Sequence, residues 1–217
     1  MADGIPAARQ IPQGRADHLA SFTARVQGLG PMGTSSVPRG YFGIGVERVS
    51  KPMNLGALLR TAHAFGASFA FAIAPDLRFR DAKRSDTSAT PEHLPFYTFA
   101  SAAELMLPKG CALVGVELLE EADDLPSFRH PRQAAYVLGP ERGSLSPELM
   151  AVCDFLVRIP TRFCINLSVA GAIVLYDRLL SAGRFAERPI VAGAAPLPLA
   201  PHRHGAPIWV KKRARRA

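Results

Sequence analysis

Short apolar runs alternate with helix-like segments along residues 41–182. Apolar runs bounded by polar or turn residues predict buried strands. They lie at 41–49, 68–74, 96–99, 111–118, 134–139 and 154–159. Helical spacing, capping signals or the length of an apolar stretch predict helices at 54–66, 101–107, 147–152 and from 166 onward. Strands that alternate with helices are typical of a largely parallel sheet with helices on both faces. The expected fold class is therefore α/β.

The segment 54–66 is the clearest amphipathic helix. Its apolar residues recur at helical spacing and form one face: Leu55, Leu58, Leu59, Ala62 and Phe65. Asn54 is the predicted N-cap, and Gly66 is the predicted stop. Arg60 lies opposite the apolar face on the helical wheel, so its side chain is expected to project away from the core.

The helix that begins at Asn166 has a different pattern, because it is apolar on every side as far as Tyr176. A helix without a polar face must be buried. This helix is therefore expected inside the domain or against a second subunit.

The two ends of the chain differ from its middle. Residues 1–40 show little periodicity and are expected to form an N-terminal extension, and residues 41–188 are the expected main domain. The segment 189–217 begins rich in proline and alanine and ends in a basic tail behind Trp209. A GxGxxG match at 28–33 lacks the preceding strand and following helix of a dinucleotide site, so a nicotinamide enzyme is not favoured.

Charge and cysteine content narrow the class of partner and compartment. The chain has 26 Lys and Arg against 18 Asp and Glu, a net charge of +8. Such a surplus favours a polyanionic partner such as nucleic acid. The alternative is that the positive charge serves solubility alone. The three cysteines have no CxxC spacing, which indicates neither disulfides nor a zinc site. No signal peptide and no apolar run of about 20 residues is recognisable, so a cytoplasmic protein is expected.

Three segments far apart in the sequence carry candidate chemistry. The first reads N-x-G-x-x-x-R-T-A from Asn54 to Ala62, the second is LGPERG at 138–143, and the third is IPTRFCINLSVAGAIVLYDR at 159–178. In this order they resemble motifs 1, 2 and 3 of the SpoU/TrmH-type SPOUT RNA methyltransferases. The resemblance covers roughly residues 41–182.

The resemblance implies a fold, a cofactor and a reaction. It implies a SPOUT fold with a C-terminal deep trefoil knot, a homodimer, and S-adenosyl-L-methionine as the methyl donor, without a metal. The implied reaction is methylation of a ribose 2′-hydroxyl of tRNA or rRNA. By position, Gly139, Ile159 and Ile165 are expected to contact the cofactor, with Leu138, Cys164 and Val116 as neighbours. Cys164 stands where the family usually has serine, so a hydrogen bond from that position is expected to be weaker.

The resemblance also assigns the catalytic candidates Arg60, Asn54, Glu141 and Asn166. Arg60 is implied to act at the target ribose, often from the other subunit of the dimer. Because a guanidinium is a poor base, binding of the adjacent phosphate and stabilisation of the developing 2′-alkoxide are favoured. Proton abstraction by Arg60 and a purely solvated arginine are the alternatives.

Two other functions stay open at this point. One is a methyltransferase of the same fold that modifies an RNA base, and the other is a non-catalytic protein that binds RNA or the ribosome. Motif 1 favours the ribose, and retention of Asn54, Arg60, Glu141 and Asn166 favours catalysis. The choice between tRNA and rRNA is open, with the compact length slightly favouring tRNA.

Overall fold

The computed structural model describes residues 40–76, 94–183 and 185–197. The predicted extension at 1–39, the polar segment around 78–90 and the basic tail at 209–217 lie outside these ranges. The chain divides into two units, 1–183 and 184–217. In the second unit, residues 185–197 contain no helix or strand. The domain boundaries expected at residues 40 and 188 stay a prediction.

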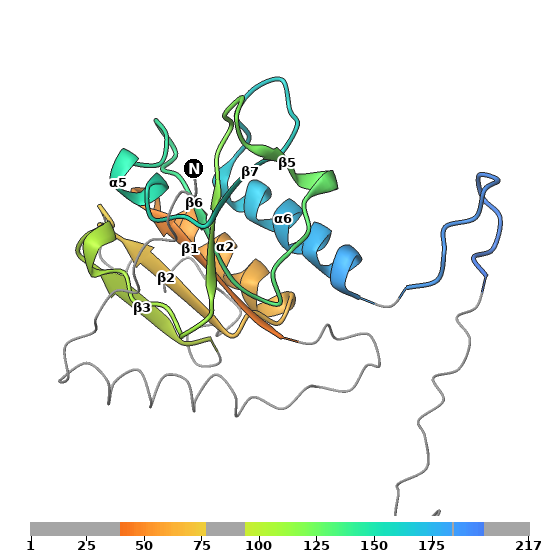
Figure 1. Ribbon diagram of the computed structural model, residues 1–217, viewed down its shortest axis with the longest axis horizontal. Coiled ribbons are helices and arrows are strands. Elements are labelled where there is room, and N and C mark those ends of the chain that lie inside the picture. The colour runs from red at the N-terminus through yellow and green to blue at the C-terminus, as the bar shows by residue number, and fades with distance from the viewer. Residues whose placement is uncertain (1–39, 77–93, 184, 198–217) are drawn as a thin grey trace, which may run out of the picture. The chain divides into compact units, whose positions relative to one another are not determined.

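The first unit is built on a seven-stranded sheet in which every pairing is parallel, which confirms the predicted α/β class. Its strands are β1 (Tyr41–Glu47), β2 (Phe69–Ile73), β3 (Phe96–Phe99), β4 (Ala112–Val116), β5 (Asp123–Asp124), β6 (Gln133–Leu138) and β7 (Phe155–Arg158). The order across the sheet is β3-β2-β1-β6-β4-β7-β5 (Figure 1). Strand β6 thus lies between β1 and β4, which precede it by many residues.

Helices pack on both faces of this sheet. They are α2 (Pro52–Ala64), α5 (Pro147–Met150) and α6 (Leu167–Ala182), with 3-10 turns η2 (Ala102–Glu104) and η3 (Leu125–Ser127). Side chains of α2 and α6 share one buried cluster with Ile44, Val114 and Tyr136 of the sheet. A second cluster joins Leu149 of α5 to Phe71 and Val137. The sheet is therefore the middle layer of three.

Glycines allow close contacts both between the layers and within the sheet. A Cβ atom on Gly171 of α6 would overlap Leu58 Cδ1 of α2, so the two helices meet at this glycine. A Cβ on Gly45 of β1 would overlap the ring of Phe71 in β2. Strand β1 therefore carries glycines where neighbouring rings fill the space.

Several expectations from the sequence need correction. Helix α2 begins at Pro52 with Lys51 as its N-cap, so Asn54 lies inside the first turn and does not cap it. Asn166 does cap α6, and its side chain accepts a hydrogen bond from Ser168 N. The expected helix at 101–107 is only the turn η2, and the short edge strand β5 was not foreseen, because two acidic residues carry no strand signal.

Helix α6 is buried on one face only within this chain. Leu167, Val174 and Leu175 lie in the core, whereas Val169, Ile173 and Tyr176 are 49%, 37% and 50% exposed. Full burial inside the domain was therefore wrong, and the alternative of a second subunit stays a prediction.

A buried polar cluster fixes the end of the sheet where β6 begins. Arg178 of α6 is 3% exposed and donates hydrogen bonds to the carbonyls of Pro131 (2.6 Å) and Arg132 (2.9 Å) and to the hydroxyl of Tyr136 (3.0 Å). His130 Nδ1 lies 2.5 Å from the Tyr136 hydroxyl, and its Nε2 lies 2.9 Å from Asp177 Oδ2. These contacts link α6 to the start of β6.

Acidification is expected to destabilise the fold through His130. Burial lowers the pKa of His130, helped by the charge of Arg178 and opposed by Asp177, so the neutral ring is favoured in the native state. Because the unfolded histidine binds a proton more readily, stability is complete above about pH 6.5 and falls below it, by at most about 1.4 kcal/mol per pH unit for this one proton. Urea unfolding at pH 7.5 and pH 5.5 measures the slope.

The matched variants are His130→Asn and His63→Asn, since His63 is an exposed histidine on α2. His130→Asn should flatten the dependence over this range, and His63→Asn should preserve it. An equal slope in wild type and His130→Asn would contradict the assignment.

Candidate functional site

A cleft of about 360 Å³ opens at the carboxyl ends of β4, β6 and β7, beside the N-termini of α2 and α6. Ligands of parallel sheets commonly bind at this edge, where the loops diverge. The cleft is lined by all six predicted cofactor residues: Val116, Leu138, Gly139, Ile159, Cys164 and Ile165. Asn54, Glu141 and Asn166 also line it. The fold thus brings the three sequence motifs to one place.

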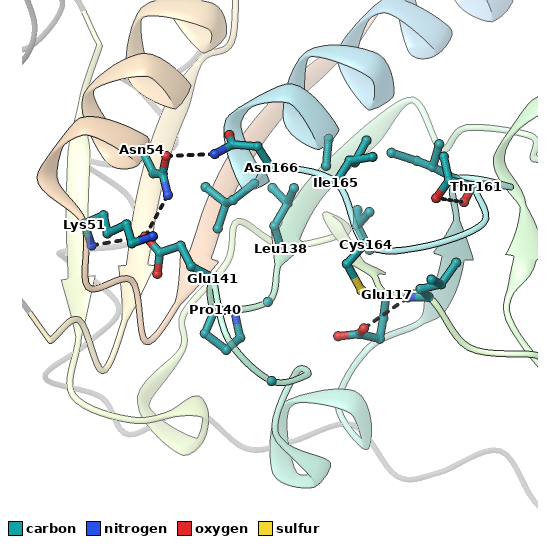
Figure 2. A pocket seen from close by; sticks show the side chains of 17 residues that line it. Lys51, Asn54, Glu117, Leu138, Pro140, Glu141, Thr161, Cys164, Ile165 and Asn166 are labelled. Atoms are coloured by element: carbon teal, nitrogen blue, oxygen red, sulfur yellow. Dashed lines mark hydrogen bonds between the residues drawn. The ribbon is translucent and has the colours of Figure 1, made fainter.

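A chain of hydrogen bonds joins the three motifs directly. Asn54 Nδ2 donates to Glu141 Oε1, and Asn166 Nδ2 donates to Asn54 Oδ1, both at 3.1 Å. Figure 2 shows Glu141, Asn54 and Asn166, in this spatial order, along one side of the cleft. Asn54 departs from its predicted capping role because its amide bridges motif 2 and motif 3.

The side chain of Glu141 makes more hydrogen bonds than that of Asn54 or Asn166. Its carboxylate also accepts hydrogen bonds from Ser50 N, Ser50 Oγ and Lys51 N, each at 3.1 Å. Partial burial alone would raise the pKa of Glu141, but these donors and Asn54 outweigh it, and the net effect is a lowered pKa. Glu141 is therefore an acceptor that fixes the start of α2, and it is not suited to donate a proton at neutral pH.

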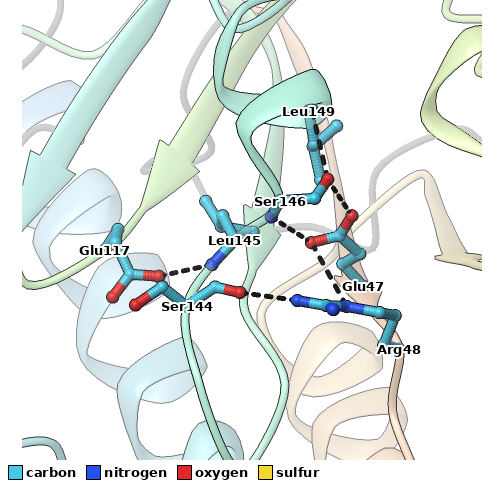
Figure 3. Close-up of polar contacts among 7 residues, drawn as sticks. All are labelled: Glu47, Arg48, Glu117, Ser144, Leu145, Ser146 and Leu149. Carbon is cyan, nitrogen blue, oxygen red and sulfur yellow. Dashed lines mark hydrogen bonds and ion pairs between the residues drawn. The ribbon is translucent and has the colours of Figure 1, made fainter.

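Two further carboxylates hold the loop that follows β6. Glu47, at the end of β1, accepts hydrogen bonds from Ser146 N at 2.7 Å and from the Ser146 hydroxyl. Glu117, just after β4, accepts from Leu145 N at 2.8 Å. Arg48 Nη2 donates to Ser144 O at 2.8 Å, so three successive loop residues are held (Figure 3).

Glu47 and Glu117 were not among the site residues predicted from the sequence, although the sequence carries a signal for them. Each is the last residue of a Gly-Val-Glu tripeptide, Gly45-Val46-Glu47 and Gly115-Val116-Glu117. Leu138 of β6 pairs with Val46 of β1 on one side and with Val116 of β4 on the other. Each glutamate is the next residue after one of these valines. Acids at the carboxyl ends of parallel strands on either side of a shared neighbour lie at the same edge of the sheet.

The loop between β7 and α6 forms the opposite wall. Thr161 Oγ1 lies 3.0 Å from the carbonyl oxygen of Phe163 and 3.3 Å from that of Ile159, and donates its single proton to one or the other within the loop. Cys164 and Ile165 line the cleft, whereas Phe163 is 73% exposed. The cysteine that replaces the expected serine therefore does lie at the site.

Arg60 lies outside this cleft. It is exposed on α2 and is not among the lining residues, which confirms that it projects away from the core. It follows Asn54 by six positions, which places it ~9 Å further along the helix and about 120° around it. Within the part of the chain that the structure describes, no hydrogen bond or ion pair of Arg60 is found. Its side chain is free to meet a molecule that approaches from outside.

The cleft suits a nucleoside more than a metal ion. Val116, Leu138 and Ile165 give it apolar walls, and the backbone of Gly139 lines it without a side chain between. Among residues 40–76, 94–183 and 185–197, no group of three or more His, Cys, Asp or Glu is placed to hold a metal. In the same ranges no helix is both long and apolar enough to cross a membrane.

Comparisons with known proteins agree with this geometry. The sequence profile of the SpoU rRNA Methylase family matches residues 42–176. The tRNA (guanosine(18)-2'-O)-methyltransferase of Escherichia coli K12 is 26% identical over 137 residues, which are 61% of this chain and 60% of that protein. The enzyme of the same name from Thermus thermophilus is 28% identical, and the match covers 66% of this chain and 78% of that protein.

Solved structures show the same fold. The SpoU methyltransferase AviRb from Streptomyces viridochromogenes, solved with AdoMet, aligns with a TM-score of 0.58 at 25% identity, over 66% of this chain and 58% of that one. The Aquifex aeolicus protein described as a TrmH/SpoU tRNA modifying enzyme aligns with a TM-score of 0.56 at 16% identity, over 76% of this chain and 83% of that one. The chain thus spans about 60% of the Escherichia coli relative and of AviRb.

Proposed function

Because the chain belongs to the SpoU rRNA methylase family, we propose that it transfers a methyl group from S-adenosylmethionine to a ribose 2′-hydroxyl of RNA. The observation that carries this proposal is the hydrogen-bonded chain Glu141–Asn54–Asn166 at the edge of the cleft. It joins one residue from each of the three motifs, and each keeps the polar group that its motif supplies. A fold retained only for binding would not need these three side chains in register.

The residues of the cleft fit S-adenosylmethionine. Apolar side chains of Val116, Leu138, Ile159 and Ile165 can enclose the adenine, and the backbone at Gly139 and Cys164 can read its edge. When bound, this cofactor supplies an activated methyl group, so the protein has to supply alignment and charge stabilisation. The proposal includes two further features of the family, a trefoil knot in the fold and a bent conformation of the bound cofactor.

Arg60 and a second subunit complete the proposed site. Arg60 is exposed and does not line the cleft of its own chain, so it can act on the RNA bound to a partner if two copies associate. The apolar stripe of Val169, Ile173 and Tyr176 on α6 supports a homodimer, since such a stripe is stabilised by covering it. In the dimer Arg60 would hold the target phosphate and stabilise the 2′-alkoxide.

The substrate is proposed to be tRNA or rRNA, and the location the cytoplasm. The net charge of +8 supports a nucleic-acid partner. Several relatives are named for guanosine 18 of tRNA, and the Nitrosomonas europaea relative is named for 23S rRNA. These names all specify a ribose 2′-oxygen, which supports the ribose over a base.

Methylation of bulk RNA from a strain that lacks the gene tests the reaction. With labelled cofactor, the label should appear in a 2′-O-methylnucleoside after nuclease digestion. Label on a base would contradict the proposed ribose target. Folded protein that binds S-adenosylhomocysteine and transfers no label to any RNA would favour the non-catalytic alternative.

Gly139→Val tests the cofactor assignment in a binding assay. A Cβ at this position would lie 3.1 Å from Glu117 Oε2 and 3.2 Å from Leu145 N, so a valine must push into the cleft or displace the loop. Calorimetry should show at least a ~10-fold loss of affinity for S-adenosylhomocysteine, equal to about 1.4 kcal/mol. Unchanged affinity in a folded Gly139→Val protein would remove Gly139 from the site.

A further inference from the structure

Glu117 holds the loop after β6, and its carboxylate also faces the cleft. Oε2 accepts from Leu145 N at 2.8 Å, and Oε1 accepts from Leu118 N at 3.1 Å. A carboxylate has about four acceptor positions. Within the described part of the chain these two amides are the donors that reach it, so acceptor capacity remains. Figure 2 shows the carboxylate directed into the space between Pro140 and Cys164.

The position of this carboxylate relative to Gly139 defines what it can reach. Glu117 Oε2 lies 3.1 Å from where a Cβ of Gly139 would be, and both residues line the cleft, so the carboxylate is next to the backbone of that glycine. A nucleoside whose base lies against Gly139 must place its sugar within a few ångströms of the base. The vicinal hydroxyls of a ribose are two donors side by side, and a carboxylate with free acceptor positions is their natural partner.

We propose that Glu117 accepts hydrogen bonds from the ribose hydroxyls of the bound cofactor and thereby selects a ribonucleoside. This inference rests on the proposed function, because it takes the cleft to hold S-adenosylmethionine. It assigns Glu117 a contact with the ligand in addition to its contact with Leu145. A deoxyribose analogue would leave a partly desolvated carboxylate position without a donor, which is why binding should discriminate.

Glu47 provides a matched control for the structural part of this role. It follows the same Gly-Val-Glu pattern, holds the same loop through Ser146, and flanks β6 on the other side. It is 3% exposed and does not line the cleft. A change at Glu47 can loosen the loop but cannot remove a contact with the sugar.

The experiment compares binding of S-adenosylhomocysteine with binding of its 2′-deoxy and 3′-deoxy analogues by calorimetry. Wild type should bind the ribose form roughly 10-fold to 100-fold more tightly than either analogue, the range for a hydrogen bond to a charged group. Glu117→Gln and Glu117→Ala should reduce this ratio to less than about 3-fold. Glu47→Gln should keep the wild-type ratio, even where it weakens all three ligands together.

Each other outcome overturns an identifiable claim. Wild-type discrimination retained in both Glu117 variants, or lost equally in Glu47→Gln, would overturn the ribose contact and leave Glu117 as a loop residue. Tight binding of S-adenosylhomocysteine without methyl transfer to RNA would instead contradict the proposed reaction, and the ratio would still decide the role of Glu117. Failure of wild type to bind S-adenosylhomocysteine would overturn both proposals.

Discussion

Replacement of Arg60 by alanine should lower methyl transfer by at least ~10²-fold, the loss typical of one preorganised charge-stabilising group. Because Arg60 is exposed and lies outside the cleft, Arg60→Ala should leave the fold and the affinity for S-adenosylhomocysteine nearly unchanged. Arg60→Lys should rescue little, since a point charge cannot reproduce the planar fork of a guanidinium. Single-turnover methylation of bulk RNA with labelled cofactor measures the effect.

Arg129→Ala is the control for charge, because Arg129 is also exposed but precedes β6 and so lies toward the other end of the sheet. Its rate should stay near that of wild type. A wild-type rate for Arg60→Ala would show that the assignment of motif 1 is wrong.

Mixing two impaired variants extends the same prediction to the dimer. In a heterodimer of Arg60→Ala and Gly139→Val, one of the two sites has an intact cleft and an intact arginine if Arg60 acts across the interface. A statistical mixture should then recover about a quarter of the wild-type sites. No recovery would place Arg60 on the RNA bound by its own subunit.

Glu141→Ala should have the second-largest effect, because it removes the acceptor shared by Ser50, Lys51 and Asn54. We expect the free energy of unfolding to fall by about 2 kcal/mol, since several donors lose a charged partner but can reach water in part. Methyl transfer should fall by at least ~10-fold, because Asn54 and Asn166 lose their fixed orientation. Urea unfolding and single-turnover rates measure the two effects.

The lowered pKa of Glu141 gives this prediction a pH dependence. The stabilisation is complete above the unfolded carboxyl pKa of about 4.3 and is lost as the pH falls through the lower folded value. Glu141→Ala should therefore lose less stability than wild type between pH 5 and pH 3. Glu148→Ala, which removes an exposed acid on α5, should behave like wild type in that range.

A double-mutant cycle separates a connected chain from independent contacts. Effects of Glu141→Ala and Asn166→Ala on the rate should not add, because Asn54 links the two side chains. Strict additivity would mean that the three hydrogen-bonded side chains act independently.

The sequence predicted those parts of the site that depend on local pattern. Strand runs, the amphipathic face of α2 and the start of a helix at Asn166 follow from hydrophobic periodicity and turn signals, and the structure confirms them. The resemblance to a family placed Val116, Gly139 and Ile165 together, although more than 20 residues separate each from the next. Local pattern alone could not have done this.

The errors of sequence analysis have physical causes. Asn54 looked like an N-cap because it precedes an apolar run, but its amide bonds across the chain to Glu141 and Asn166. Its true role depends on contacts 87 and 112 residues away, which no local rule contains. Full burial of α6 inside its own domain was wrong, because apolar residues on all sides do not say which molecule covers them, and burial against a second subunit stays a prediction.

The central position of β6 has a consequence for how the chain folds. Its residue Gln133 pairs with Tyr41, so β1 gains one of its two neighbours only after some 90 further residues exist. Glu47 likewise reaches Ser146 only from that later segment, 99 residues on. Parallel pairings of such sequence separation slow folding, because a long loop must close before the contact stabilises anything. During synthesis on the ribosome, β1 and β4 therefore lack their pairing with β6 until β6 has emerged.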